Sequence, residues 1–183
     1  GYDHDGDGFT EVPVINSQSV GMRSFFRTGA YSRITAQYHH INEFRRGGDM
    51  LDRPPHEALI AEQIDHSIDG GSLSFDISSP DRRNRFNAYA SFQNTARKSY
   101  YGSKQDPDAY GTTHDLTVAA GMQYIHEFRK LLFMPSELTF GTEYSYDDLG
   151  DRSIGYDIHT DQTVHIVGAY LQNEWKTRKW SLL

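Results

Sequence analysis

The sequence contains no cysteine, so disulfide bonds and thiolate metal sites are excluded. It also lacks any run near the roughly 18 consecutive apolar residues that a membrane-spanning helix requires. Its mean hydropathy is low, at -0.69. Such a value is compatible with a soluble protein, and also with a β-barrel in which half of each strand faces a polar lumen.

Positive charge is scarce as well. The chain has 18 Lys and Arg against 25 Asp and Glu, a net charge of -7, and nucleic-acid binding depends on basic residues that neutralise phosphates. We therefore expect no nucleic-acid partner. A Walker loop, a dinucleotide fingerprint and a nucleophile elbow are missing, and the nine histidines show no paired metal-ligand spacing. We expect no enzymatic activity, and polar or lumen-facing positions for the histidines.

What the sequence has is an alternation with a period of two residues. Between Arg85 and Thr95, every second residue is apolar and the residues between them are mostly polar. The same alternation runs from Leu116 to Phe128. Successive side chains of a strand point to opposite faces, so the pattern predicts strands with one apolar and one polar face.

The alternation extends along most of the chain and predicts about eight or nine antiparallel strands. We expect strands at 20–28, 33–44, 72–78, 85–97, 115–128, 137–146 and 163–174, with another beginning at Trp180. Residues 57–68 fit a helix or a strand, and a strand is preferred. The last residues look like the start of a further strand, so we expect the chain to be a piece of a longer protein. A trimmed mature domain is the alternative.

The predicted connections alternate in length. Short ones lie at 29–32, 79–84, 129–136 and 176–179, and long ones at 45–56, 98–114 and 147–162. An up-and-down meander of this kind is typical of an outer-membrane barrel, with short periplasmic turns and longer extracellular loops. The residues predicted to face outer-membrane lipid are Phe86, Ala88, Phe92, Leu116, Val118, Met122, Leu138 and Phe140. Aromatic residues near strand ends fit interfacial girdles, or ordinary strand propensity and packing.

An acidic motif opens the chain. The run from Asp3 through Asp5 and Asp7 to Gly8 matches the first half of a calcium loop, with acidic residues at alternate positions. The second half departs from an EF-hand, because Val14 stands at the twelfth position and Glu11 at the ninth. We expect a calcium site of another type with Asp3, Asp5 and Asp7 as metal ligands and further oxygens from 106–108. A solvated acidic turn is the alternative.

Several phrases resemble TonB-dependent outer-membrane receptors, especially the branch found in Bacteroides-type bacteria. They are Asp5-Gly-Asp-Gly-Phe-Thr-Glu11, His40-Ile-Asn-Glu-Phe-Arg-Arg-Gly-Gly48, Pro54-Pro-His-Glu57, and Ser99-Tyr-Tyr-Gly102 leading to Ala109-Tyr-Gly-Thr112. The resemblance implies a plug domain inside a 22-stranded transmembrane barrel. Residues 1–183 would then be a partial barrel domain that lacks the plug and the remaining strands.

The resemblance also implies a function and a location. The segment would belong to the outer membrane of a Gram-negative bacterium and help to import a scarce small-molecule nutrient, such as a metal chelate or a cobalamin-like ligand. The TonB complex would act through the missing plug. Cobalamin transporters of this family carry an acidic extracellular loop that binds calcium, and Asp5 to Phe9 is similar to it. This similarity implies that Asp5 and Asp7 are ligands, whereas Asp3 follows from spacing alone.

Two other functions remain open. The chain could be a soluble, calcium-stabilised β-rich binding module, which would be a compact monomer without detergent. It could also be a small closed membrane barrel of eight strands with a structural role. If it is instead a segment with two free sheet edges, we expect edge-to-edge self-association, because unpaired strand edges are templates for another chain.

Overall fold

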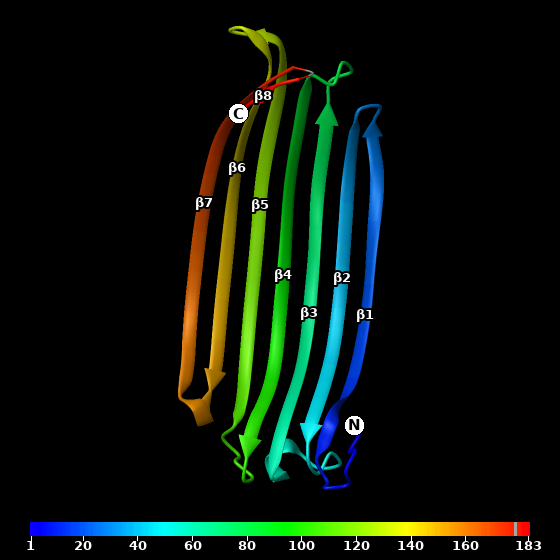
Figure 1. The fold of residues 1–183 in the computed structure, drawn as a ribbon, viewed down its shortest axis with the longest axis vertical. Coiled ribbons are helices and arrows are strands. Elements are labelled where there is room, and N and C mark those ends of the chain that lie inside the picture. Colours follow the sequence, from blue (N-terminus) through cyan, green and yellow to red (C-terminus); the bar gives the residue numbers. More distant parts are fainter. Residues whose placement is uncertain (178) are drawn as a thin grey trace.

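The computed structural model describes residues 1–177 and 179–183, which form one antiparallel sheet of eight strands in chain order (Figure 1). The strands are β1 Thr10–Gly29, β2 Ser32–Gly48, β3 Ile60–Ser78, β4 Asn84–Ser103, β5 Tyr110–Leu131, β6 Met134–Ser153, β7 Ile158–Lys176 and β8 Ser181–Leu182. The all-β class, the strand number and the up-and-down meander predicted from the sequence are confirmed.

Two short 3-10 helices complete the described fold. They are η1, Pro55–Glu57, between β2 and β3, and η2, Ile154–Tyr156, between β6 and β7. Among the described residues, no helix has the length and apolar character needed to cross a membrane.

The strands are longer than their apolar alternation predicted. Residues 98–114 and 147–162 were expected to be loops, but β4 and β5 leave only 104–109 between them, and β6 and β7 only 154–157. In these extensions polar pairs replace apolar ones across the strands. Thr113 Oγ1 donates to Asp151 at 2.6 Å, and Thr163 Oγ1 to Asp148 at 3.1 Å. Polar pairs can stabilise a sheet as apolar pairs do, so the end of the apolar pattern did not mark the end of the strand.

The two segments 57–68 and 72–78 belong to one strand, β3, which starts at Ile60. The preference for a strand in the ambiguous stretch is confirmed, and the gap predicted between the two segments, which holds Gly70 and Gly71, is wrong. Each glycine has an aromatic ring from a neighbouring strand over it: a Cβ on Gly70 would meet the ring of His39, and one on Gly71 the ring of Phe92. These rings cover the space that the glycines leave, and the ladder continues through them.

The connections fall at two ends of the sheet, here called the turn end and the loop end. The turn end holds β1–β2, β3–β4 and β5–β6, at 30–31, 79–83 and 132–133. The loop end holds 49–59, 104–109 and 154–157. The predicted alternation in length is confirmed for 49–59 alone: 104–109 is one residue longer than 79–83, and 154–157 is shorter than it, because the strands extend into the expected loops. The turn predicted at 176–179 includes Arg178, which lies outside the described residues; Thr177 N donates to Trp180 O at 2.8 Å there.

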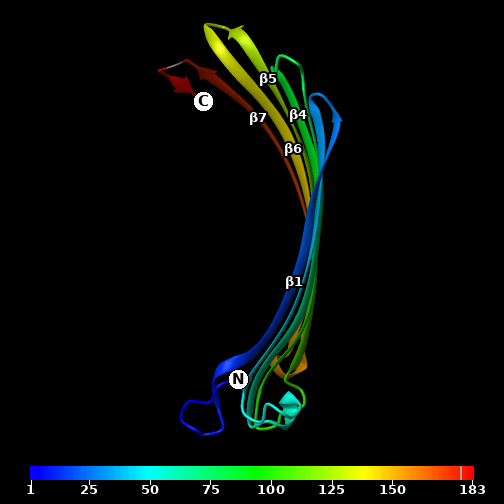
Figure 2. The same cartoon turned by 90° about the vertical axis from the view of Figure 1, so that its right-hand side faces the viewer.

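The sheet is a single curved layer (Figure 2). The buried hydrophobic residues of the described chain form one small cluster at the loop end: Ala58, Ala61, Tyr100 and Ala109. Large apolar side chains along the strands are exposed instead, such as Met22 at 69% and Leu171 at 71%. A soluble domain buries such side chains between two packed layers, and the described residues supply only one.

Glycines opposite aromatic rings recur in the sheet. Gly121 pairs directly with Tyr89, and a Cβ at Gly121 would lie 2.8 Å from Tyr89 Cε1. The hydroxyl of Tyr89 continues across β5 to donate to Glu143. The glycine therefore lets a tyrosine of one strand reach a carboxylate two strands away.

Gly121→Val is expected to displace this ring and break the bond to Glu143, at a cost of about 1–3 kcal/mol. The midpoint of urea unfolding in detergent micelles measures the change. Gly168→Val is the matched control, because a Cβ at Gly168 would meet nothing within 4 Å. Equal losses in both variants would contradict a role for the glycine under Tyr89.

Candidate functional site

The strand register gives the sheet one apolar face and one polar face. The short helix η1 packs on β3 and β4, and its neighbour Ala58 is buried together with Ala61 and Tyr100. The pairing places these two strand residues on the apolar face. Figure 2 shows η1 on the convex side of the sheet, so the apolar face is convex and the polar face concave.

Four rows of paired residues on the convex face form an apolar band. In the part of the chain described, these rows contain no Asp, Glu, Lys or Arg. The row nearest the loop end is Met22–Tyr38–Gly71–Phe92–Val118–Tyr146–His165, and the row nearest the turn end is Ile77–Phe86–Tyr124–Phe140–Leu171. All eight residues that the sequence predicted for lipid contact share this face, with Leu116 and Leu138 in the rows that border the band.

Polar residues border the band on both sides. The loop-side border row is Val20–His40–Asp69–Asn94–Leu116–Asp148–Thr163, and the turn-side border row is Asn84–His126–Leu138–Asn173. From Asn84 to Asn94 the chain covers about 33 Å at the usual strand rise. For strands tilted by about 40°, this becomes about 25 Å along a membrane normal, the height of the apolar band of outer-membrane barrels.

Tyrosines in the outermost rows of the band direct their hydroxyls toward its borders. Tyr38 Oη donates to Asp69 Oδ1 at 2.5 Å on the loop side. Tyr124 Oη donates to Asn84 Oδ1 at 2.7 Å on the turn side. A ring on the apolar side and a hydroxyl on the polar side is the arrangement that tyrosine adopts at membrane–water interfaces.

The concave face is polar at the same height. Arg33 pairs with Asp76 at 3.3 Å, and Asn87 donates to the other oxygen of Asp76 at 2.8 Å. Further along, Tyr170 Oη donates to Gln123 at 3.0 Å. The two faces of the same strands thus differ sharply, one without ionic side chains across four rows and the other with a hydrogen-bonded network.

The acidic motif forms a compact loop before β1, on the concave side of the loop end (Figure 2). Asp3 holds the loop, since its two carboxylate oxygens accept from Gly6 N at 2.7 Å and from Gly8 N at 2.9 Å. Both glycines have positive φ, 76° and 87°, a conformation that glycine adopts without steric cost. Asp7 caps the next turn by accepting from Phe9 N at 2.8 Å.

The structure brings Asp3, Asp5 and Asp7 together with a fourth carboxylate, Glu11, with ligand oxygens within 4.8 Å of one another. The site fits calcium by its donor set, because Ca²⁺ takes carboxylate oxygens at 2.3–2.6 Å, and oxygens on opposite sides of one ion then lie about this far apart. Carboxylates this close also repel one another. The predicted oxygens of 106–108 do not join the group: Asp106 Oδ1 accepts instead from Asp108 N at 2.9 Å.

Glu11 is the site residue that the sequence did not predict as a ligand. It belongs to β1, and a bridge between Tyr2 and Val12 folds the N-terminal residues back against this strand. Glu11 Oε2 accepts from His4 N at 2.8 Å as a result. Its position ninth in the motif was the available signal.

The loops at the other strands of the loop end pack around Tyr100. Its hydroxyl donates to Asp106 O at 2.9 Å, and its ring meets Tyr110 edge-on at 4.9 Å. Burial raises the pKa of this phenol. Asp49 ties the 49–59 connection by accepting from Leu59 N and Ile60 N at 3.2 and 3.0 Å. The loop end is therefore an ordered surface.

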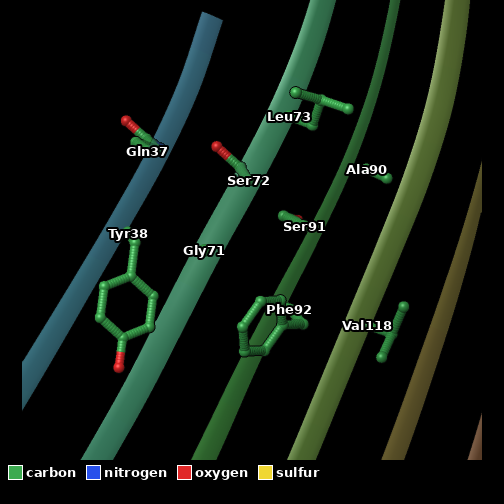
Figure 3. Close-up of a pocket in the computed structure, with 9 residues that line it drawn as sticks. All are labelled: Gln37, Tyr38, Gly71, Ser72, Leu73, Ala90, Ser91, Phe92 and Val118. Carbon is green, nitrogen blue, oxygen red and sulfur yellow. The ribbon is translucent and has the colours of Figure 1, made fainter. Parts of the chain in front are cut away.

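A shallow hollow of about 460 Å³ lies on the convex face between β2 and β5. Figure 3 shows Tyr38, Leu73, Phe92 and Val118 among the residues that line it, and the ring of Phe92 covers Gly71. The hollow is therefore apolar and lies within the band.

No family model, no curated protein and no solved structure matches the chain.

Proposed function

We propose that the chain forms part of the wall of a transmembrane β-barrel, with its convex face against lipid and its concave face toward a polar lumen. The observation that carries this proposal is the convex band: four rows without an ionic side chain, bordered by polar rows. In water such a surface would be an extended exposed apolar patch, which monomeric soluble proteins rarely have. In a bilayer, lipid covers it.

The open edges support a larger barrel. Among the residues that the structure describes, strand β1 has a neighbouring strand on one side, and β7 pairs with β8 only at Trp175 and Lys176. Backbone groups in a bilayer must be paired, which requires closure of the sheet. We propose that further strands complete the barrel. If they are absent, the edges would pair with a second copy of the chain.

The finer proposal is that the barrel is a 22-stranded TonB-dependent receptor of the outer membrane. It rests on the short phrases from Asp5 to Thr112 and on the length of the 49–59 connection at the loop end. The barrel would import a small nutrient, such as a metal chelate or a cobalamin-like compound, by binding and gated passage, with no bond chemistry. The acidic loop would bind calcium through Asp3, Asp5, Asp7 and Glu11, and so fix the concave side of the loop end where a ligand enters.

The absence of cysteine allows a direct test of the facing. We expect Ala120→Cys, labelled with a polarity-sensitive dye, to show a blue-shifted emission when the chain is refolded into phosphatidylcholine vesicles. The label on Ala119→Cys, the adjacent residue on the concave face, is expected to remain in a polar environment. The register places these two alanines on opposite faces.

A blue shift for the label on Ala119→Cys and none for the label on Ala120→Cys would show that the lipid-facing and lumen-facing sides are reversed. If neither label shifts and the chain is a compact monomer without detergent, the chain is instead the soluble calcium-stabilised binding module. A chain that needs detergent or vesicles to remain monomeric supports the barrel wall.

A further inference from the structure

A second hollow lies in line with the first on the convex face. It measures about 450 Å³, and its lining includes Asn42, Asp65, Ser67, Lys98, Thr112 and His114. Both hollows span β2 to β5, and the loop-side border row runs between them. The first hollow is apolar, and the second, nearer the loop end, carries amide, hydroxyl, basic and carboxylate groups, so the pair has the polarity of a lipid with an acyl chain and a polar head.

The cations of this region are concentrated in one place. Beyond the loop-side border row, the exposed cations on the convex face of the described strands are Lys98 and Arg152, and both belong to the row Lys98–Thr112–Arg152. Two strand spacings separate them, about 10 Å, with the hydroxyl of Thr112 between. Their long side chains can close on one phosphate over Thr112, with His114 in the adjacent row.

Neither cation is fully neutralised within the described chain. Lys98 takes part in none of the ion pairs found there, and Arg152 meets Asp161 only at 3.9 Å. Asp65 is paired with Lys98 in the register from the β3 side. This carboxylate would repel a phosphate over β3 and leaves the space over β5, between the cations, as the favourable position.

The depth of this row also fits a lipid head. Lys98 lies four residues beyond Asn94, about 13 Å along the strand, or about 10 Å along the normal for a tilt near 40°. The headgroup region extends about 5–8 Å beyond the hydrocarbon core. Lysine and arginine side chains bend back toward that level while their charged ends stay in the polar zone.

We propose that the convex face binds a phosphorylated glycolipid of the outer leaflet, lipopolysaccharide. An acyl chain lies in the apolar hollow lined by Tyr38, Leu73 and Val118, and a phosphate is bound by Lys98, Thr112 and Arg152. The amide of Asn42 and the hydroxyl of Ser67 then face the sugar. This site rests on the proposed function, because it requires the convex face to be in a membrane with the loop end outward.

The test uses the 183-residue chain in neutral detergent, with purified lipopolysaccharide as the probe and its affinity measured by thermophoresis. The double variant Lys98→Gln, Arg152→Gln is expected to bind at least about ten-fold more weakly, since each loses charge-assisted hydrogen bonds to phosphate. The matched control is Arg23→Gln, Arg45→Gln, which removes two cations from the concave face, away from both hollows, and is expected to leave the affinity unchanged. Dephosphorylated lipopolysaccharide is expected to bind the unsubstituted chain and the first double variant equally.

Equal losses in the two double variants would overturn the site, as would tight binding of the dephosphorylated lipid. Equal affinity for phosphatidylglycerol would overturn the assignment to a glycolipid. Insertion into phosphatidylcholine vesicles separates the two proposals. If the Ala120 label enters the bilayer and the binding is insensitive to phosphate, only this inference fails; if the label stays in water, the barrel wall itself fails.

Discussion

Ala120→Arg is expected to destabilise the chain in lipid by about 2–4 kcal/mol, the cost of arginine on the lipid face of a barrel near the bilayer midplane. Ala120 lies in the row Leu73–Ala90–Ala120–Tyr144, close to the centre of the apolar band. The loss arises because the guanidinium must leave water or deform the bilayer. Denaturant unfolding in phosphatidylcholine vesicles measures it.

The neighbouring residue offers a matched control. Ala119→Arg makes the same change one residue earlier, on the concave face beside Ser91 and Ser145, and is expected to cost little. Leu116→Arg remains on the convex face but in the border row, where the cost should fall to about 0–1 kcal/mol. A cost for Ala119→Arg equal to that for Ala120→Arg would refute the facing, and equal costs at positions 116 and 120 would refute the depth.

The sequence predicted the faces of the sheet well because the alternation is a local signal. In β4, the apolar residues at alternate positions from Phe86 to Phe92 all indicate the same face, and one correct assignment fixes the parity of the whole strand. The antiparallel pairing of consecutive strands could also be predicted, because short turns join them. The sheet order required no long-range information.

The extent of the strands could not be predicted in this way. Beyond the loop-side border row, both faces of the strands carry polar residues, so the apolar alternation ends. Arg97, Thr113 and Asp151 are examples, and the contacts that stabilise them in a strand can be identified only when the partner strand is known. Arg97 Nη2 donates to Thr113 Oγ1 at 2.8 Å, and Thr113 in turn donates to Asp151. Such pairs are set by register, which a single strand does not encode. The same holds for Gly70 and Gly71, whose effect depends on rings from other strands.

Aromatic residues were predicted only as a class. Tyr38 and Tyr124 lie at the two borders of the band, as interfacial girdles require, but Phe25 lies on the concave face and Phe133 stacks on Trp175 at 5.6 Å in the turn end. Aromatic residues therefore occur in three environments, namely the borders of the band, the concave face and the turn end, and proximity to a strand end does not distinguish them. The parity of the residue, combined with its distance from the border row, separates them.

The acidic site divides in a similar way. Asp3, Asp5 and Asp7 were predictable because a short loop with glycines at alternate positions brings its own side chains together. Glu11 enters through the strand pairing of Tyr2 with Val12, a contact that the motif does not specify. The four carboxylates therefore combine a local motif with one residue supplied by the sheet.

This division leads to the calcium prediction. We expect the refolded chain to bind Ca²⁺ in isothermal titration, and Asp5→Asn or Asp7→Asn to weaken binding by about ten-fold or more, because affinity depends on the charge of the ligand set. Glu11→Gln is expected to have an effect of similar size if the strand completes the site. Asp3→Asn should be the most severe, since Asp3 both contributes an oxygen and holds Gly6 and Gly8 in place.

Asp157→Asn is the matched control for charge. Asp157 is an exposed aspartate at the end of η2 with φ 53°, a conformation that asparagine accepts readily, and it is not among the four grouped carboxylates. Its replacement should leave calcium binding unchanged. Unchanged binding in both Asp5→Asn and Asp7→Asn would reduce the loop to a solvated acidic turn. Weakening in those two without any effect of Glu11→Gln would confine the site to the N-terminal motif and leave the strand with no part in it.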